Sequence, residues 1–156
     1  MSELQVGDKV PSFTLPDQDG KPFRSEDALA TGPLVLFFYP KDGSPGCTAE
    51  ACSFRDASGE FLEAGATVVG VSSDSSASHR RFADKHGLQY SLLADESGGL
   101  RKQFGVPRSM LGLVEGRVTY VIDPGGVVRH KFDAMVRVNK HVEEALATVR
   151  SLKIPS

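Results

Sequence analysis

Leu34-Val-Leu-Phe-Phe38 runs directly into Tyr39-Pro-Lys-Asp-Gly-Ser-Pro-Gly-Cys-Thr-Ala-Glu-Ala-Cys-Ser-Phe-Arg-Asp56. The first five residues form an unbroken apolar run, which is typical of a strand that is covered on both faces. We predict that a loop then leads into a helix from about Pro45 to Ala64, because Ser44 can cap a helix and a proline suits the first helical position. The sequence therefore predicts a buried strand, a loop and the first turn of a helix in direct succession, and the candidate reactive residues lie in that first turn and just after it.

Cys47 and Cys52 are the only two cysteines, and both lie in this predicted helix. A thiol in the first turn of a helix faces unpaired backbone N–H groups and the positive end of the helix dipole, and both favour the thiolate. Steps of four and three residues from Cys47 give a mostly apolar stripe, which consists of Ala51, Phe54, Ser58 and Phe61. We therefore expect Cys47 to face the core, and Cys52, roughly 140° away around the helix axis, to face a more polar side.

The two cysteines cannot form a disulfide while this helix is intact. At their spacing the rise along the axis is about 7.5 Å, which puts the two Cα atoms roughly 8.6 Å apart. A disulfide needs Cα atoms within about 7 Å. Any bond between them requires the first helical turns to unwind, and Gly46 favours this because glycine costs a helix about 1 kcal/mol relative to alanine. We predict oxidation of Cys47 in a folded pocket, then local unfolding, then disulfide formation.

Strand and helix signals alternate through the rest of the chain. We expect a hairpin from Ser12–Leu15 and Pro22–Arg24 around the turn Asp17–Gly20, and strands at Thr67–Ser72, Val118–Ile122 and Val127–Phe132, the last two joined by Asp123–Gly126. We expect further helices at Ser76–His86, closed by Gly87, at Gly98–Phe104, broken by Gly105–Pro107, and at Asn139–Leu152. This order predicts one α/β domain over residues 1–156. Its thioredoxin-like fold has a central mixed sheet flanked by helices and an added N-terminal β-hairpin.

Composition excludes several classes of protein. Of the 156 residues, 40% are hydrophobic and 24% are charged, which indicates a globular chain rather than a disordered one. The 18 basic and 20 acidic residues give a net charge of -2 without long runs of either sign, so we expect no nucleic-acid partner. The apolar runs are too short to cross a membrane, and the charged start does not fit a signal peptide. We expect a cytoplasmic protein, and in a reducing compartment two close cysteines indicate chemistry more often than a structural disulfide.

The stretch Tyr39–Asp56 closely resembles the signature of the peroxiredoxin Q, or bacterioferritin comigratory protein, subfamily of peroxiredoxins. The resemblance extends to Val6–Phe13, Gly70–Asp74, Leu92–Asp95 and Gly116–Asp123. It implies a thiol-dependent peroxidase that reduces hydrogen peroxide and organic hydroperoxides and is recycled by thioredoxin or a similar dithiol. It also implies a monomer that needs no flavin, haem or metal.

The resemblance assigns roles to individual residues. Cys47 matches the peroxidatic cysteine, and Cys52 matches the resolving cysteine with which its sulfenic acid condenses. Pro40 matches the proline that shields the sulfur from solvent, and Arg117 matches the arginine that steadies the thiolate and the peroxide oxygens. Ser44 takes the place of the active-site hydroxyl, where the family usually has threonine.

Two residues of the predicted helix complete the candidate site. Glu50 matches a recurrent acidic residue beside the site, and Gly46 offers a backbone N–H to the substrate. Attack on an O–O bond needs a thiolate, and it needs donors aimed at the oxygen that gains negative charge. The N–H groups of Gly46 and Cys47, the Ser44 hydroxyl and the Arg117 guanidinium are the candidate donors.

Two other classes of function stay open from the residues alone. A disulfide oxidoreductase of thioredoxin type normally carries Cys-x-x-Cys at the helix start, whereas four residues separate Cys47 from Cys52. A thiol redox sensor needs the same two sulfurs but no peroxidase turnover, and a metal carrier needs closer cysteines, a nearby histidine or more sulfur ligands. The four histidines show no ligand spacing with either cysteine, and we expect all of them on the surface: His79, His86, His130 and His141.

Overall fold

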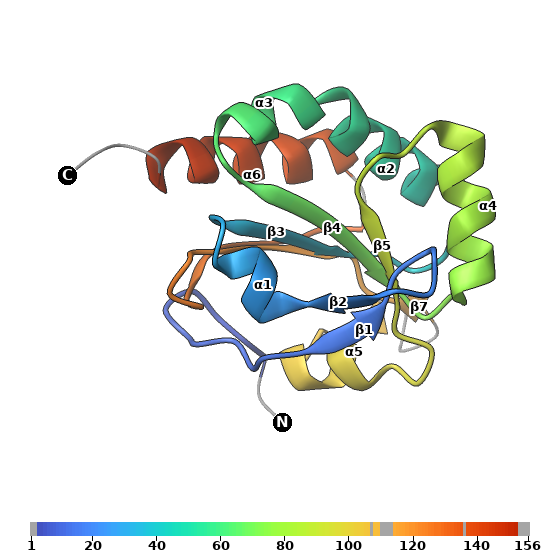
Figure 1. Cartoon of the computed structure of the whole chain (residues 1–156), viewed down its shortest axis with the longest axis horizontal. Helices are drawn as coiled ribbons and strands as arrows, with labels where there is room; N and C mark the ends of the chain where they lie inside the picture. Colours follow the sequence, from blue (N-terminus) through green and yellow to red (C-terminus); the bar gives the residue numbers. More distant parts are fainter. Residues whose placement is uncertain (1–2, 107, 110–113, 136, 153–156) are drawn as a thin grey trace.

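A five-stranded mixed sheet forms the centre of the computed structural model, which describes residues 3–106, 108–109, 114–135 and 137–152 (Figure 1). The strands lie in the spatial order β5 (Ser91–Ala94), β4 (Thr67–Ser72), β3 (Leu34–Phe38), β8 (Val118–Ile122) and β9 (Val128–Asp133). Strand β3 pairs in parallel with β4 and antiparallel with β8. Every residue of β3 and β8 is buried, as expected for strands covered on both faces.

Helices cover both faces of this sheet (Figure 1). On one face lie α2 (Pro45–Asp56), α3 (Ser58–Glu63), α4 (Ser76–His86) and α6 (Val138–Leu152), whose apolar residues form one buried cluster with β3. On the other face lie α1 (Ser25–Leu29) and α5 (Gly99–Phe104), which belong to a second apolar cluster. The predicted arrangement of a mixed sheet between helices is confirmed. Within the described part of the chain, no helix combines the length and the apolar character needed to cross a bilayer.

The predicted N-terminal hairpin is present, with slightly different bounds. It consists of β1 (Thr14–Pro16) and β2 (Pro22–Arg24), and Gly20 in its turn has a φ of 77°. A second two-stranded sheet, β6 (Arg108–Ser109) with β7 (Val114–Glu115), was not predicted, and neither were α1 and β5. All four elements are too short to produce a clear period in the sequence. Gly105 ends α5 in a left-handed conformation, whereas Pro107 of the same predicted break lies outside the described residues.

The predicted helix from Pro45 to Ala64 was wrong in one respect, because it is two helices. Ala57 has φ -92° and ψ 6°, which interrupts the helix. Ala57 is buried and Ser58, which the unbroken period placed on the core stripe, is exposed, whereas Phe61 on the same stripe is buried as predicted. The prediction that Ser44 caps the helix was also wrong in detail. Ser44 occupies the N-cap position but makes no side-chain cap, and its Oγ donates to the Lys41 carbonyl at 3.1 Å.

Candidate active site

The sulfur of Cys47 lies at the start of α2, next to the end of β3, and the residue is only 1% exposed. Its Sγ accepts a hydrogen bond from Nη2 of Arg117 at 3.3 Å. Sheet pairing explains this contact between distant parts of the sequence. Phe38 at the end of β3 is paired with Val118 at the start of β8, so residue 117 lies beside the loop that leads into α2. The structure therefore brings together the cysteine and the arginine that the sequence placed in one site.

Arg117 is held by three different acceptors. Its Nη1 donates to Oε1 of Glu50 at 2.7 Å, and its Nε donates to the Met135 carbonyl at 3.0 Å, while Nη2 faces Cys47. Burial opposes its charge, but the neighbouring Glu50 and Cys47 outweigh this effect and raise the pKa of Arg117. The guanidinium therefore stays charged, and its planar fork spans both partners in a way that an ammonium cannot.

Gly46 leaves the space that the guanidinium occupies. A Cβ at this position would lie 3.1 Å from Nη2 of Arg117, which is closer than most such contacts. The glycine therefore has a steric role beside the site, in addition to the backbone donor that the sequence analysis gave it. Any larger residue would press on the contact between Arg117 and Cys47.

Glu50 is completely buried, and only one of its two oxygens has a hydrogen-bond partner among the residues described in this structure. The second oxygen, Oε2, lies 3.4 Å from Nδ1 of His141, which α6 brings to the site. Burial raises the pKa of Glu50 to about 7, in spite of Arg117, and burial lowers the pKa of His141 to about 4. His141 is therefore neutral at working pH, and its contact with Glu50 is not an ion pair.

The prediction of surface histidines was wrong for two of the four. His79 and His141 are both 0% exposed, because each ring nitrogen has a polar partner inside the fold. The helical period contains a signal for His141 that the sequence analysis missed. His141 lies one turn before Ala145 and two turns before Val149, which places a polar residue on the buried stripe of α6.

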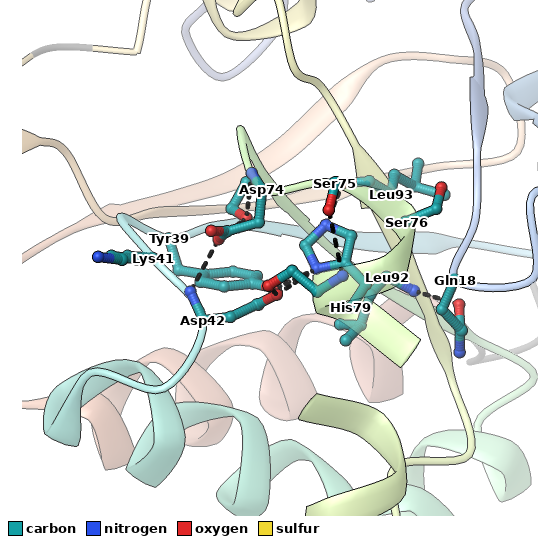
Figure 2. Close-up of polar contacts among 12 residues, drawn as sticks. Gln18, Tyr39, Lys41, Asp42, Asp74, Ser75, Ser76, His79, Leu92 and Leu93 are labelled. Carbon is teal, nitrogen blue, oxygen red and sulfur yellow. Dashed lines mark hydrogen bonds and ion pairs between the residues drawn. The ribbon is translucent and has the colours of Figure 1, made fainter. Parts of the chain in front are cut away.

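Pro40 and Ser44 lie in the loop between β3 and α2, and both are partly buried. This loop is fixed to the rest of the protein through Asp42, as Figure 2 shows. The Asp42 carboxylate accepts hydrogen bonds from the Tyr39 hydroxyl at 2.6 Å, the Ser78 hydroxyl at 2.9 Å and Nδ1 of His79 at 2.7 Å. Burial acts in the opposite direction, but these hydrogen bonds lower the pKa of Asp42.

Two further contacts complete the network of hydrogen bonds around Asp42, which we call the Asp42 brace. The backbone N–H of Asp42 donates to Oδ2 of Asp74 at 2.8 Å, and Nε2 of His79 lies 2.9 Å from the Leu93 carbonyl. The ligand atoms of Asp42, Asp74 and His79 lie within 4.8 Å of one another, which is a spacing that a metal ion can use. They do not fit a metal ion here, because hydrogen bonds from neighbouring groups already occupy them. The cluster ties the loop before Cys47 to β4, α4 and β5.

Cys52 lies on the same helix as Cys47 but is only partly buried, and both cysteines are free thiols. Its neighbours one and two turns further on, Asp56 and Glu60, are exposed. The expected orientation, with Cys47 inward and Cys52 on a polar side, is confirmed. Because α2 is helical from Pro45 to Asp56, the separation that prevents a disulfide in the folded state applies to this structure.

Comparison with known proteins identifies the class to which this site belongs. The AhpC/TSA family model matches residues 6–131. Chloroplastic peroxiredoxin Q from Sedum lineare is 46% identical over 152 residues, which cover 97% of this chain and 81% of that protein. The corresponding protein from Arabidopsis thaliana is 45% identical and covers 96% of this chain and 69% of its own length.

Solved structures agree with this result. Peroxidoxin BcpB from Mycobacterium tuberculosis has a TM-score of 0.90 and 42% identity, and the match covers 99% of this chain and 100% of that one. A cysteine-to-serine mutant of PrxQ from Xylella fastidiosa has a TM-score of 0.88 and 30% identity, with 97% and 99% covered. The thioredoxin-like fold predicted from the sequence is therefore confirmed.

The chain belongs to the AhpC/TSA family, and within it to the peroxiredoxin Q, or bacterioferritin comigratory protein, subfamily. It is a thiol-dependent peroxidase, as the sequence predicted. The plant relatives are chloroplastic by name and do not support the predicted cytoplasmic location.

Proposed function

We propose that Cys47 is the peroxidatic cysteine of this peroxidase. The observation that supports this role is the 3.3 Å contact between its buried Sγ and Nη2 of Arg117 at a helix N-terminus. The Cys47 thiolate attacks one oxygen of the peroxide, so that an S–O bond forms while the O–O bond breaks. Sulfur is oxidised to sulfenic acid, and the second oxygen takes up a proton and leaves as water or an alcohol. Arg117 and the N–H groups at the helix start stabilise the charge on that oxygen.

Cys52 is the resolving cysteine in this scheme. Its thiol attacks the sulfenic sulfur of Cys47, water leaves, and an intramolecular disulfide forms once the first turns of α2 have unwound. The partial exposure of Cys52 leaves it accessible to a dithiol reductant such as thioredoxin, which restores both thiols by exchange. The brace at Asp42 precedes the part of the loop that must move.

The remaining residues of the predicted site act around this centre. Pro40 shields the sulfur, the Ser44 hydroxyl and the Gly46 N–H contact the substrate, and Glu50 acts through Arg117 because it is fully buried. The bacterioferritin comigratory protein from Xanthomonas campestris, which is 33% identical to this chain, has alkyl peroxide reduction activity. This supports organic hydroperoxides as substrates beside hydrogen peroxide. We assign the activity to a single domain over residues 1–156, which acts as a monomer in the cytoplasm. Size-exclusion chromatography with light scattering tests whether the protein is a monomer.

A comparison of thiol variants tests the catalytic assignment. Reduced wild-type protein should lose both free thiols with hydrogen peroxide and should then support peroxide-dependent NADPH oxidation through thioredoxin reductase and thioredoxin. Cys47→Ser should abolish both effects, whereas Cys52→Ser should still consume about one peroxide per chain and stop at sulfenic acid. Turnover that survives Cys47→Ser would refute the assignment. Thiol loss in the wild type without turnover would instead indicate a redox sensor.

Hydrogen exchange tests the unwinding step. The oxidised protein should lose helicity and amide protection over residues 45–56, while the protection of β3 and β4 stays unchanged. The Cys52→Ser variant treated with peroxide is the matched control, because it can be oxidised but cannot form the disulfide. Equal protection of residues 45–56 in the reduced and disulfide forms would contradict the mechanism.

A further inference from the structure

One buried oxygen of the active site has no hydrogen-bond donor within the part of the chain that the structure describes. Oε2 of Glu50 is fully buried and has no hydrogen-bond partner among the described residues, whereas Oε1 of the same carboxyl group accepts from Arg117. An ionised carboxylate oxygen in such a place costs free energy, since it has lost its water and gained no partner. A protonated Oε2 needs the opposite kind of partner, which is an acceptor.

The nitrogen that faces Oε2, Nδ1 of His141, is the candidate for that acceptor. Its Nε2 lies 2.8 Å from the Ala134 carbonyl, which can only accept, so Nε2 carries the ring proton. In the neutral ring Nδ1 therefore presents a lone pair, and Nδ1 is the atom 3.4 Å from Oε2 of Glu50. The Thr119 hydroxyl lies 2.7 Å from the same Nδ1 and competes for this lone pair. The surroundings of Oε2 thus favour the protonated carboxyl group and oppose the ionised one.

We infer that Glu50 carries a proton on Oε2 in the reduced enzyme and releases it when Cys47 is oxidised, so that Glu50 serves as the proton store of the peroxide step. This inference rests on the proposed function of Cys47. Before the step, the charge of Arg117 is balanced by the Cys47 thiolate, and Glu50 is neutral. After the step, the sulfenic acid is neutral and Glu50 is ionised against Arg117. The buried pocket keeps a net charge of zero in both states.

The balance of atoms is complete in this scheme. The thiolate electron pair forms the S–O bond, the O–O pair goes to the leaving oxygen, and that oxygen gains one proton while Glu50 loses one. Bulk solvent therefore supplies no net proton to the reaction. Without such a store, each thiolate that is oxidised takes one proton from solvent.

The other charged and titratable groups around the pair fit this assignment. Cys47 and Arg117 face Glu50, and Tyr90 interacts with it from the segment before β5. Glu144 on α6 raises and Arg117 lowers the pKa of His141, but burial has the largest influence and keeps the ring neutral. The raised pKa of Glu50, about 7, agrees with a carboxyl group that can hold or release its proton near neutral pH.

Proton uptake during a single turnover tests the inference. Reduced Cys52→Ser protein is mixed with hydrogen peroxide in weak buffer with a pH indicator, about one pH unit below the Glu50 pKa of about 7. Ultraviolet absorbance is used first to verify that Cys47 is a thiolate at that pH. In the Glu50→Gln variant of this protein the amide imitates the neutral carboxyl group but has no proton to release. The Cys52→Ser protein that also carries Glu50→Gln should take up about one proton per sulfur oxidised. The Cys52→Ser protein that keeps Glu50 should take up close to none. Uptake of one proton by both proteins would overturn the inference.

Two variants at the second partner separate proton storage from simple packing. His141→Gln brings an amide N–H that can donate to Oε2, which favours ionised Glu50, so proton uptake should rise toward one. Thr119→Val removes the competing hydroxyl and leaves the Nδ1 lone pair to Glu50, so uptake should stay close to none. The opposite result in either variant would count against the role of His141. A sulfenic-acid probe keeps the two proposals apart, because absence of Cys47 oxidation would refute the proposed function instead.

Discussion

His79 and His141 are both fully buried, and each lies beside a carboxyl group, but the two pairs differ in their donors. Asp42 accepts from Tyr39, Ser78 and His79, and these bonds lower its pKa. Glu50 accepts on one oxygen only, and burial raises its pKa to about 7. The same residue types therefore produce a fixed hydrogen-bonded pair in one place and an exchangeable proton in the other.

The difference lies in the number of donors that reach each carboxyl group, because donors stabilise the charged form against the cost of burial. The Asp42 pair holds the loop before Cys47 in place. The Glu50 pair adjoins Arg117, the guanidinium that contacts Cys47, where the proposed mechanism changes the charge. A rigid support beside a site of changing charge is what a preorganised catalytic centre requires.

The largest effect is expected from breaking the fixed pair. Asp42→Ala leaves the Tyr39 hydroxyl and His79 without their acceptor in the interior, and it should lower the free energy of unfolding by about 3–5 kcal/mol. Urea denaturation followed by circular dichroism measures this. Asp84→Ala is the matched control, since Asp84 pairs with Arg80 at the exposed surface and should contribute less than about 1 kcal/mol. Equal losses in the two variants would show that the Asp42 cluster is not a brace.

The second prediction concerns the pH dependence of stability at the other pair. Between pH 4.5 and about 7 the folded protein keeps the Glu50 proton while the unfolded chain has lost it, so Glu50 makes stability fall as pH rises. We compare the free energy of unfolding of Glu50→Gln with that of wild type at each pH. The difference, variant minus wild type, should increase by about 3 kcal/mol from pH 4.5 to about 7. Urea denaturation at several pH values gives this difference.

His141 and Asp42 have the opposite sign. Between about pH 4 and 6.5 the unfolded chain binds a proton that buried His141 refuses, so stability rises with pH, and Glu50→Gln should reveal this slope. The stabilisation by Asp42, whose folded pKa is lowered, is present above its ordinary value of 3.8 and is lost in acid. A stability difference between Glu50→Gln and wild type that does not change with pH would contradict the proposed contrast between the pairs.

The third prediction concerns the cation that Glu50 and Cys47 share. Arg117→Lys keeps the charge but loses the fork that reaches both partners, so the second-order rate constant for peroxide should fall by about 100-fold. Stopped-flow kinetics at several peroxide concentrations measures it. Arg129→Lys should leave the rate unchanged, because Arg129 pairs with Asp123 at a largely exposed position. A normal rate in Arg117→Lys would show that charge alone is sufficient.

The smallest effect is expected at Gly46. Gly46→Ala places a Cβ 3.1 Å from Nη2 of Arg117, so the guanidinium must shift by a few tenths of an ångström, and the peroxide rate should fall a few-fold. Gly59→Ala in α3 is the control, because its Cβ meets no atom within 4 Å. Both variants should stabilise their helix by up to about 1 kcal/mol. A rate loss of equal size in Gly59→Ala would assign the effect to helix stability rather than to Arg117.

Local patterns in the sequence predicted much of the site and failed at the point where a helix is interrupted. The four- and three-residue steps placed Cys47, Ala51 and Phe54 in the core, which is confirmed. The same steps placed Ser58 there as well, because a period cannot show that Ala57 interrupts the helix. The positions of Arg117 and Glu50 came from resemblance to a family, since no local pattern relates residues so far apart in the chain.

The sequence by itself determined the buried strand β3, the helix that follows it and the opposite orientation of its two cysteines, because these depend on the side-chain period of a single element. Only the tertiary structure decided which buried groups meet. Pairing of β3 with β8 brings Arg117 to Cys47, and packing of α6 against α2 brings His141 to Glu50. The charge states of these groups follow from burial and from the number of donors around them, and both are properties of the folded chain.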